Sequence, residues 1–474
     1  MNPTKSLIPI VLPLASALAQ GPDPLVTFRF PETTMSLSGG TPLQTIWPNE
    51  IAQVRYAGQP PCPVFHTCEK WSPRTCFQAM AGDENGNGQY WNPSLFAQID
   101  ALCLPSSGMT IPRHNPRSVF WSPTAAMGTN VSAAPLRPGD VGRITFGQVE
   151  YFLRQEQVNK ALGLQLTTAI DIDAIAYQVG LGVYLSLDNP VSATTACGFV
   201  TVNDGDVIAI PDSAITWSLD YRVADVLPNS AAVVLTELQI NAMLANSGIA
   251  DRFGSPLTLA LDLEALDIDQ SPQASVWMFQ CGSYTVPVPQ FLFATQSMTG
   301  ASLLSTIGGG TIPFGPCSPL AMAAPNPSSG VPMGIQPVSS TVGAASYINA
   351  LAFATTKRFV LEPQNHQLNY GGLGGPGTTV HIGSDFPLVF TWIEFVSPVL
   401  PAAITVAPFV SPDCFPDYYF PSNLFWNMQL TSGGIGTFAT PAIPVGWSGK
   451  MLFQSAALDG PTFQLSTPAV IDVQ

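Results

Sequence analysis

The segment IDIDAIAYQVGLGVYLSLD, residues 170–188, contains two short strand patterns that decide the fold. The first, IDAI at 172–175, places an apolar, a polar, a small and an apolar residue in order. Such alternation predicts a half-buried strand. The second, VYLS at 183–186, contains an aromatic and two aliphatic residues, which favour strands. The segment therefore predicts two strands of a small sheet.

These patterns recur along the chain in the same order. The first pattern returns as IDAL at 99–102, LEAL at 263–266 and INAL at 348–351, at steps of 73, 91 and 85 residues. Strands that contain aromatic residues follow at 119–122 and 276–279, Gly-Asp-Val steps lie at 139–141 and 205–207, and the helix-like stretch 156–162 aligns with 238–244. Repeats of this size are supersecondary units that cannot bury their own apolar faces. A propeller-like ring of units is favoured over sandwiches in a row.

We accordingly predict an all-β fold in which a repeat-containing, propeller-like domain of small sheets with short helical insertions precedes an antiparallel β-sandwich. The predicted divisions are a signal peptide at 1–19, a cysteine-stapled N-terminal β unit at 20–105, a repeat region at 106–356 and the sandwich at 357–474. Eight strand patterns separated by turn signals support the last division. The segment 311–344, rich in Pro, Gly and Ser, is expected to be a long loop.

Composition limits the function. The 474 residues are 46% hydrophobic and only 10% charged, and 31 acidic against 16 basic residues give a net charge of -15. Binding to nucleic acid needs clustered Lys and Arg, so nucleic acid is excluded as a partner. The 46 Pro and 40 Gly residues indicate many short strands joined by turns.

The first residues predict export. Lys5 precedes a short apolar stretch, and Ala17-Leu18-Ala19 forms a small-x-small cleavage signal. The apolar stretch is too short to span a membrane. We therefore expect a secreted or cell-surface protein that keeps no transmembrane anchor after the signal is removed.

Four of the eight cysteines cluster near the N-terminus, namely Cys62, Cys68, Cys76 and Cys103. In an oxidising compartment these four predict two disulfides, with three connectivities open. A zinc site is the alternative, although the spacing lacks the paired C-x2-C knuckles of such sites.

A calcium loop is a second site hypothesis. Asp83, Asn85 and Asn87 place short oxygen-bearing side chains at alternate positions before Gly88, as in the first half of an EF-hand loop. Ser94 stands where the bidentate Glu would be expected, and Asn-Gly-Asn-Gly is also ordinary turn chemistry. Calcium is therefore the one cofactor the sequence suggests, beside the alternative of a plain turn.

Acidic residues beside the repeat strands suggest a third hypothesis. They are Asp171, Asp173, Asp262, Glu264, Asp267 and Asp269. Paired carboxylates could serve a secreted polysaccharide hydrolase. Because the acids recur in several units, the sequence favours instead a solvated face of the strands.

The densest aromatic cluster lies in the predicted sandwich. It comprises Tyr418, Tyr419, Phe420, Phe425 and Trp426. Exposed rings could stack on sugar faces, which would make this region carbohydrate-binding. The alternative is a core or interdomain cluster.

Two longer segments carry a resemblance to a family. The stretch 433–473, with its Gly-x-Gly strand, Pro-containing strand, Leu452-Phe453-Gln454 and the Asp459 turn, resembles the C-terminal β-domain of large secreted proteins of unknown function from planctomycete-type bacteria. The stretch 137–164 followed by IDIDAI is similar to repeats of the same proteins. The resemblance implies an exported β protein and no catalytic residues.

These observations favour an exported protein with a structural or binding role, and glycans or other surface proteins as partners. The alternative is the secreted polysaccharide hydrolase.

Overall fold

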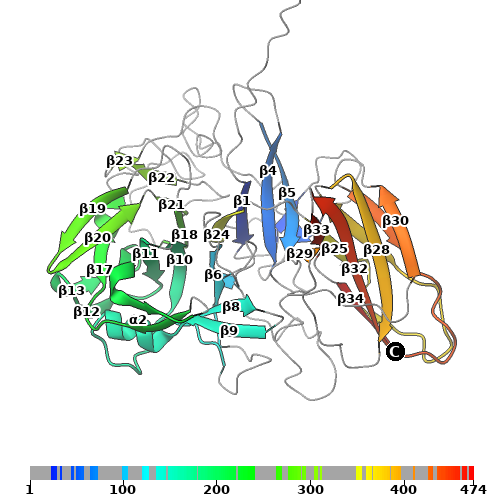
Figure 1. Ribbon diagram of the computed structural model, residues 1–474, viewed down its shortest axis with the longest axis horizontal. Helices are drawn as coiled ribbons and strands as arrows, with labels where there is room; N and C mark the ends of the chain where they lie inside the picture. Colours follow the sequence, from blue (N-terminus) through cyan, green and yellow to red (C-terminus); the bar gives the residue numbers. More distant parts are fainter. Residues whose placement is uncertain are drawn as a thin grey trace, which may run out of the picture.

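The computed structural model consists mostly of β-strands in several small, largely antiparallel sheets (Figure 1). The structure describes residues 23–28, 32–34, 44–46, 50–57, 64–72, 99–104, 120–126, 135–145, 148–178, 180–219, 222–240, 263–268, 276–289, 291–294, 304–307, 310–311, 348–354, 359–365, 367–384, 386–396, 409–410, 425–430, 435–459, 462–466 and 469–474. Among these residues no helix is long and apolar enough to cross a membrane. The predicted all-β class is confirmed.

The first sheet begins at the tetrad IDAL. It has the order β6-β7-β8-β9, with antiparallel neighbours throughout. Its strands are β6 (Ile99–Cys103), β7 (Phe120–Pro123), β8 (Val141–Thr145) and β9 (Gln148–Leu153). The helix α2 (Gln155–Ala161) follows β9 and confirms the helical insertion expected at this position.

The second sheet repeats this plan, in the order β10-β11-β14-β17. Its strands are β10 (Ile172–Gln178), β11 (Gly182–Leu187), β14 (Val207–Pro211) and β17 (Ala232–Leu235). Two hairpins are inserted, β12 (Val191–Thr195) with β13 (Gly198–Val202), and β15 (Ile215–Trp217) with β16 (Val223–Val226), the latter preceded by η2 (Asp212–Ala214). Residues 237–240 are helical after β17, as residues 155–161 are after β9.

Equivalent side chains make equivalent hydrogen bonds in the first two sheets. The hydroxyl of Ser122 on β7 lies 2.9 Å from the carbonyl oxygen of Asp140. The hydroxyl of Ser186 on β11 lies 2.9 Å from the carbonyl oxygen of Asp206. Each serine thus ties the second strand to the Gly-Asp-Val step before the third strand. These matched contacts confirm the repeat between the two units.

The aspartates of the Gly-Asp-Val steps form a second matched contact, which we call the aspartate clip. In the first unit the backbone amide of Gln155 donates to Asp140 Oδ1 at 2.7 Å. In the second unit the backbone amide of Glu237 donates to Asp206 Oδ1 at 2.7 Å. The other oxygen of each carboxylate accepts from the amide three residues upstream, at 2.9 Å in both units. A single buried carboxylate therefore joins the turn before the third strand to the first turn of the helix, whose amides lack partners within the helix.

Strand β10 is buried on both faces, in contrast to the half-buried strand expected from alternation. Ile172 and Ile175 belong to a core cluster shared with the first sheet, whereas Ala174 and Ala176 belong to a cluster shared with the third. Ile172 and Ile175 share a cluster although they are three residues apart, because the pairing register with β11 shifts at Asp173. A bulge of this kind adds one residue and reverses the side-chain alternation.

The third sheet differs from the alignment expected from sequence. Its first strand, β18 (Ala265–Ile268), pairs with β21 (Phe291–Ala294) rather than with residues 276–279. Residues 276–279 lie in β19 (Val276–Cys281), which forms a separate hairpin with β20 (Tyr284–Pro289). The sheet continues with β22 (Leu304–Ile307) and β23 (Gly310–Thr311). The aromatic pattern of residues 276–279 therefore belongs to an inserted hairpin and not to the second strand of the third sheet.

The fourth sheet combines the two ends of the repeat region, in the order β24-β1-β4-β5. Its strands are β24 (Ile348–Ala354), β1 (Asp23–Phe28), β4 (Ile51–Ala57) and β5 (Val64–Ser72), and a small hairpin of β2 (Glu32–Thr34) and β3 (Gln44–Ile46) follows β1. The boundary predicted after residue 105 therefore divides the first sheet, because β6 pairs with β7 across it. The boundary near 357 falls between β24 and the next strand.

The four strands that carry the tetrads meet one another. Each is the edge strand of its sheet, and contacts run from β6 to β10, from β10 to β18, from β18 to β24 and from β24 back to β6. Figure 1 shows these four strands gathered near the centre of the left-hand half. The tetrads thus occupy equivalent positions in four sheets.

The helix α2 connects the first unit to the second through its C-terminal carbonyl groups, which have no partners within the helix. Three amides of the second unit donate to them: Asn229 N to Lys160 O at 3.0 Å, Ala231 N to Ala161 O at 3.0 Å, and Thr194 N to Leu162 O at 2.8 Å. Gly163 then ends the helix with a φ of +65°. The end of α2 is therefore capped by the neighbouring unit together with two local bonds, from the backbone amide of Gly163 to Lys160 O at 3.2 Å and from that of Leu164 to Asn159 O at 2.8 Å.

Replacing Gly163 with alanine is expected to lower the free energy of unfolding by about 2 kcal/mol. An added Cβ would lie 2.3 Å from Asn229 Oδ1 and 2.8 Å from the backbone oxygen of Thr194, in a left-handed conformation that disfavours side chains. Gly180 is the matched control, because it has a φ of +81° but no atom within 4 Å of an added Cβ. Urea denaturation of both variants measures the difference. Equal losses at the two glycines would contradict the close approach at Gly163.

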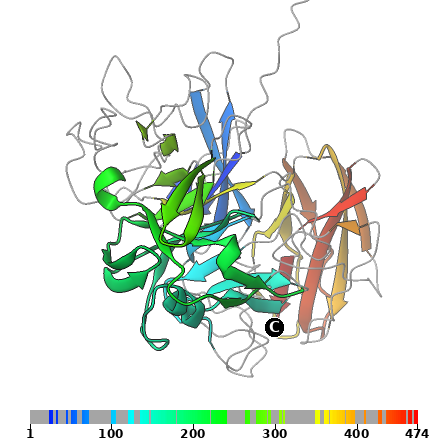
Figure 2. The same cartoon turned by 60° about the vertical axis from the view of Figure 1, so that its left-hand side comes forward.

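The last hundred residues form two sheets. One has the order β25-β27-β31, and the other contains β26-β34-β32-β28-β30, with β33 pairing to β32 and β29 pairing to β33. The strands are β25 (Phe359–Pro363), β26 (Gln367–Leu368), β27 (Thr379–Ser384), β28 (Leu388–Val396), β29 (Phe409–Val410), β30 (Phe425–Leu430), β31 (Ile435–Ala439), β32 (Gly449–Asp459), β33 (Thr462–Leu465) and β34 (Ala469–Val473). Side chains of both sheets share one hydrophobic cluster, and these strands lie together to one side in both views (Figures 1 and 2). The pairs β26–β34 and β29–β33 are parallel, whereas the sequence predicts antiparallel strands throughout.

Candidate functional site

Three acidic residues in or directly after the tetrads are buried, which corrects the expectation that the acids beside the repeat strands form a solvated face. Asp173 is 3% exposed, Glu264 is 1% exposed and Asp267 is 2% exposed. They are buried because each tetrad strand packs against two neighbouring sheets instead of one. Buried carboxyl groups are costly unless they are hydrogen-bonded or hold a proton. Asp262 and Asp269 lie outside the described residues.

Asp100 and Asp171 are acids of two different units that influence each other. Asp100 is the bulged residue of β6 and is 4% exposed, and Asp171 lies directly before β10. The two carboxyl groups are close enough for the negative charge of Asp100 to raise the pKa of Asp171. The pair therefore brings acids of two different units near each other where the first and second sheets meet.

The surroundings of Asp171 favour its protonated form. Burial, followed by the negative charges of Asp100 and Asp188, raises the pKa of Asp171 to about 7. The amide of Ile172 acts in the opposite direction by donating a hydrogen bond, but does not offset these effects. Asp171 can therefore gain and lose a proton near neutral pH.

Cys103 is a free, buried thiol at the end of β6, so it takes part in neither of the two disulfides predicted for the N-terminal cysteines. Its Sγ donates to the Leu104 carbonyl at 3.6 Å. Burial, reinforced by the charge of Asp267, raises its pKa well above the usual value and makes it a poor nucleophile. Cys62 and Cys76 lie outside the described residues, and only the backbone of Cys68 is described, in β5.

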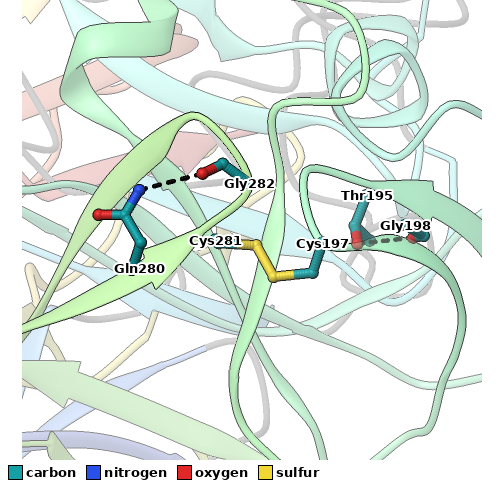
Figure 3. The surroundings of a disulfide bond; sticks show 6 residues. All are labelled: Thr195, Cys197, Gly198, Gln280, Cys281 and Gly282. Atoms are coloured by element: carbon teal, nitrogen blue, oxygen red, sulfur yellow. Dashed lines mark hydrogen bonds between the residues drawn. A yellow bond between two sulfur atoms is a disulfide. The ribbon is translucent and has the colours of Figure 1, made fainter.

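A disulfide that the sequence reasoning missed joins Cys197 to Cys281, with their Cα atoms 4.9 Å apart (Figure 3). Cys197 lies in the turn between β12 and β13, and Cys281 ends β19. The bond therefore ties an inserted hairpin of the second unit to an inserted hairpin of the third. Gly282 makes this approach possible, because a Cβ there would lie 2.4 Å from the Ala196 carbonyl oxygen. The signal that could have indicated this disulfide is that both cysteines lie at the turns of hairpins.

Most of the other predicted site residues lie outside the part of the chain that the structure describes. Asp83, Asn85 and Asn87 lie outside the described residues, as do Tyr418, Tyr419 and Phe420. Phe425 and Trp426 begin β30, where Trp426 pairs with Trp392 of β28. Within the described part of the chain, no group of three or more His, Cys, Asp or Glu residues is placed to hold a metal ion.

Comparisons with known proteins do not show a family to which this chain belongs. No protein-family model matches the chain, and no curated protein matches it. A solved structure of alpha-2-macroglobulin from E. coli, in its native conformation, is 10% identical, with a TM-score of 0.13. The match covers 96% of this chain and 29% of that one, and similarity at this level carries no argument about fold or function.

Proposed function

We propose that this is an exported protein of the cell surface or extracellular space, with a structural or binding role and no catalysis. The observation that carries the proposal is the Cys197–Cys281 disulfide between two units. Disulfides persist in oxidising compartments and are rare in the cytosol. The low content of charged residues and the small-x-small signal before Gln20 agree with export.

The proposed architecture is a propeller-like ring of four sheets followed by a β-sandwich. Its support is the cyclic order of contacts among β6, β10, β18 and β24, together with the shared cluster of the two C-terminal sheets. In such a ring β1 closes the circle, because it pairs along its whole length with β24 from the far end of the repeat region. Each sheet then covers the apolar face of the next, which suits a rigid extracellular scaffold.

The proposed partners are glycans or other surface proteins. The aromatic residues of segment 418–426 support glycan binding by the C-terminal region, and the loop at 83–88 supports a calcium dependence. Neither site depends on the buried acids of the tetrads.

The test is a glycan array probed with the purified, oxidised protein, with and without added calcium. Binding to a defined glycan class, lost in a Trp426→Ala variant, is the expected result for a binding protein. Release of reducing sugar from a bound polysaccharide would instead establish the secreted hydrolase. Absence of binding in both conditions would remove the glycan part of the proposal and leave protein partners to be tested by cross-linking at the cell surface.

A further inference from the structure

We propose that two neighbouring loops of the C-terminal sheets, residues 370–377 and 441–448, dock the protein on the surface of a lipid bilayer. We call these two loops the apolar loop pair. The proposal goes beyond the proposed function, because it assigns a lipid surface as a further partner and does not depend on the binding of glycans.

The apolar loop pair presents two aliphatic side chains to solvent. Leu373 in the first loop is 79% exposed, and Val445 in the second is 80% exposed. The loops are joined beside these two residues, because the Gly446 amide donates to the Gly372 carbonyl oxygen at 2.8 Å. Single exposed aliphatic side chains are ordinary, whereas two on loops that are bonded together indicate a surface for an apolar partner.

The backbone of the pair supplies many of its own hydrogen bonds. Five amides of the pair donate to carbonyl oxygens of the pair, namely those of Leu373, Gly375, Ile443, Gly446 and Trp447. Gly375 and Ile443 exchange two of these bonds, at 3.2 and 2.8 Å. Pro376 and Pro444 have no amide donor. Because hydrocarbon offers no hydrogen-bond partner to an amide, a backbone that is satisfied internally suits contact with lipid.

The pair is held in a fixed shape. Gly374 has a φ of +68°, and a Cβ at this position would lie 2.7 Å from the Ile443 carbonyl oxygen. At the base of the first loop the Tyr370 amide donates to the Gln474 carbonyl oxygen at 2.9 Å, beside the chain end marked C in Figure 1. Loops that are fixed before binding lose little conformational entropy when they dock.

Two aromatic residues of the pair combine apolar rings with polar groups. Tyr370 and Trp447 are partly buried and pack against the hydrophobic cluster shared by the C-terminal sheets. The Tyr370 hydroxyl donates to the Pro376 carbonyl oxygen. Tyrosine and tryptophan are favoured at the interface between hydrocarbon and water, so their place beside the exposed aliphatic residues agrees with a lipid partner.

The two segments that contain the loops are uncharged at the level of acids and strong bases. Residues 363–384 and 431–449 contain no Asp, Glu, Lys or Arg, although the whole chain has a net charge of -15. The ionisable side chains within them are those of His366, Tyr370 and His381. Insertion of these loops into a bilayer therefore does not require the desolvation of a carboxylate, an ammonium or a guanidinium group.

A bilayer fits this surface better than a protein or a glycan does. The polar side chains of the pair are those of Tyr370, Trp447 and Ser448, whereas protein and glycan partners are recognised through many placed hydrogen-bonding groups. A second copy of the chain fits less well, because two aliphatic side chains expose far less than the roughly 1,200 Å² that a stable interface buries. The net charge favours a zwitterionic bilayer over an anionic one.

The experiment measures flotation of the purified, oxidised protein with phosphatidylcholine vesicles at millimolar lipid. We expect weak and reversible binding, because the apolar area that inserts is small. The double variant Leu373→Ser, Val445→Ser should lower the partition coefficient roughly tenfold or more. The matched control is Leu238→Ser with Phe199→Ser, since these side chains of the second unit are 78% and 77% exposed. The control should bind as the wild type does.

Salt and lipid charge distinguish apolar docking from electrostatic attraction. Binding to phosphatidylcholine should persist at high salt, and added phosphatidylglycerol should not strengthen it, because the chain is acidic. No binding of the wild type to phosphatidylcholine, or an equal loss in the two double variants, would overturn the proposal. Binding confined to anionic vesicles and abolished by salt would also overturn it.

Hydrogen exchange of the wild type keeps the test decisive if the loop variant folds poorly. Phosphatidylcholine vesicles should slow exchange in residues 370–377 and 441–448 and leave residues 191–202 unchanged. Slower exchange elsewhere, with the two loops unaffected, would contradict docking through the pair. Analytical ultracentrifugation tests the other occupant: a wild-type dimer that the loop variant does not form, without binding to vesicles, would assign the loops to a second copy and overturn the lipid proposal.

Discussion

Replacing Asp140 with alanine is expected to lower the free energy of unfolding by about 3 kcal/mol. The Asp140 carboxylate has no exposed surface and bonds to Arg137 through the amide at 2.9 Å, Nε at 2.9 Å and a terminal nitrogen at 3.0 Å. It also accepts from the Gln155 amide at the start of α2, at 2.7 Å. Alanine would leave the backbone amides of Arg137 and Gln155 without the Asp140 carboxylate as acceptor, at a site where a water molecule cannot take the place of that carboxylate. The Arg137 side chain is 35% exposed and can be hydrated again, which keeps the loss below that of a fully buried ion pair.

Two matched variants separate the aspartate clip from ordinary surface charge. Asp206→Ala removes the equivalent clip of the second unit, where Asn203 replaces the arginine, so its loss should be smaller than that of Asp140→Ala. Glu156→Gln weakens only the partly exposed ion pair with Arg137 and should cost about 0.5 kcal/mol. Thermal and urea unfolding followed by circular dichroism give the three values. A loss at Asp140 no larger than at Glu156 would show that the clip does not hold the helix.

The repeat was predictable from sequence because its contacts are short-range. Ser122 and Ser186 each bond to a turn 18 or 20 residues away, and each aspartate clip closes within one unit. Sequence patterns that follow one another in the same order in both units therefore identify the first two sheets and the helical segment after each. The C-terminal strands were predictable for the same reason, since turn residues separate them and most pair with antiparallel neighbours.

The wrong predictions arise from long-range pairing. An aromatic strand pattern does not reveal whether its partner is the preceding strand, and so residues 276–279 were assigned to the third sheet rather than to a hairpin. The pairing of β1 with β24 joins segments more than 300 residues apart, which no local pattern encodes. Burial of Asp173 and Glu264 likewise follows from packing between sheets, whereas alternation within one strand indicates a solvent-facing side. The Asp100–Asp171 pair was hidden for the same reason, since its members belong to different units.

The second large effect is expected from Cys197→Ser, which should lower the free energy of unfolding by about 3 kcal/mol. The disulfide closes a loop with a sequence separation of 84 residues, which contains β14 and β17 of the second sheet and β18 of the third. Without it the unfolded chain gains conformational freedom, and the hairpins β12–β13 and β19–β20 are held together only by packing. Cys197 is exposed, so serine is tolerated there, whereas Cys281 is fully buried and a serine at that position would add an unsatisfied hydroxyl.

The measurement compares oxidised wild type, reduced wild type and Cys197→Ser by thermal unfolding and by hydrogen exchange of residues 191–202 and 276–289. The variant should lose exchange protection in both hairpins, and added reductant should not change them further, because the bond is already absent. In the wild type, reductant should bring both hairpins to the level of the variant. Hairpins that remain protected in Cys197→Ser would mean that the close approach of Gly282 to Ala196 suffices to hold the two units, and that the disulfide contributes little to their junction.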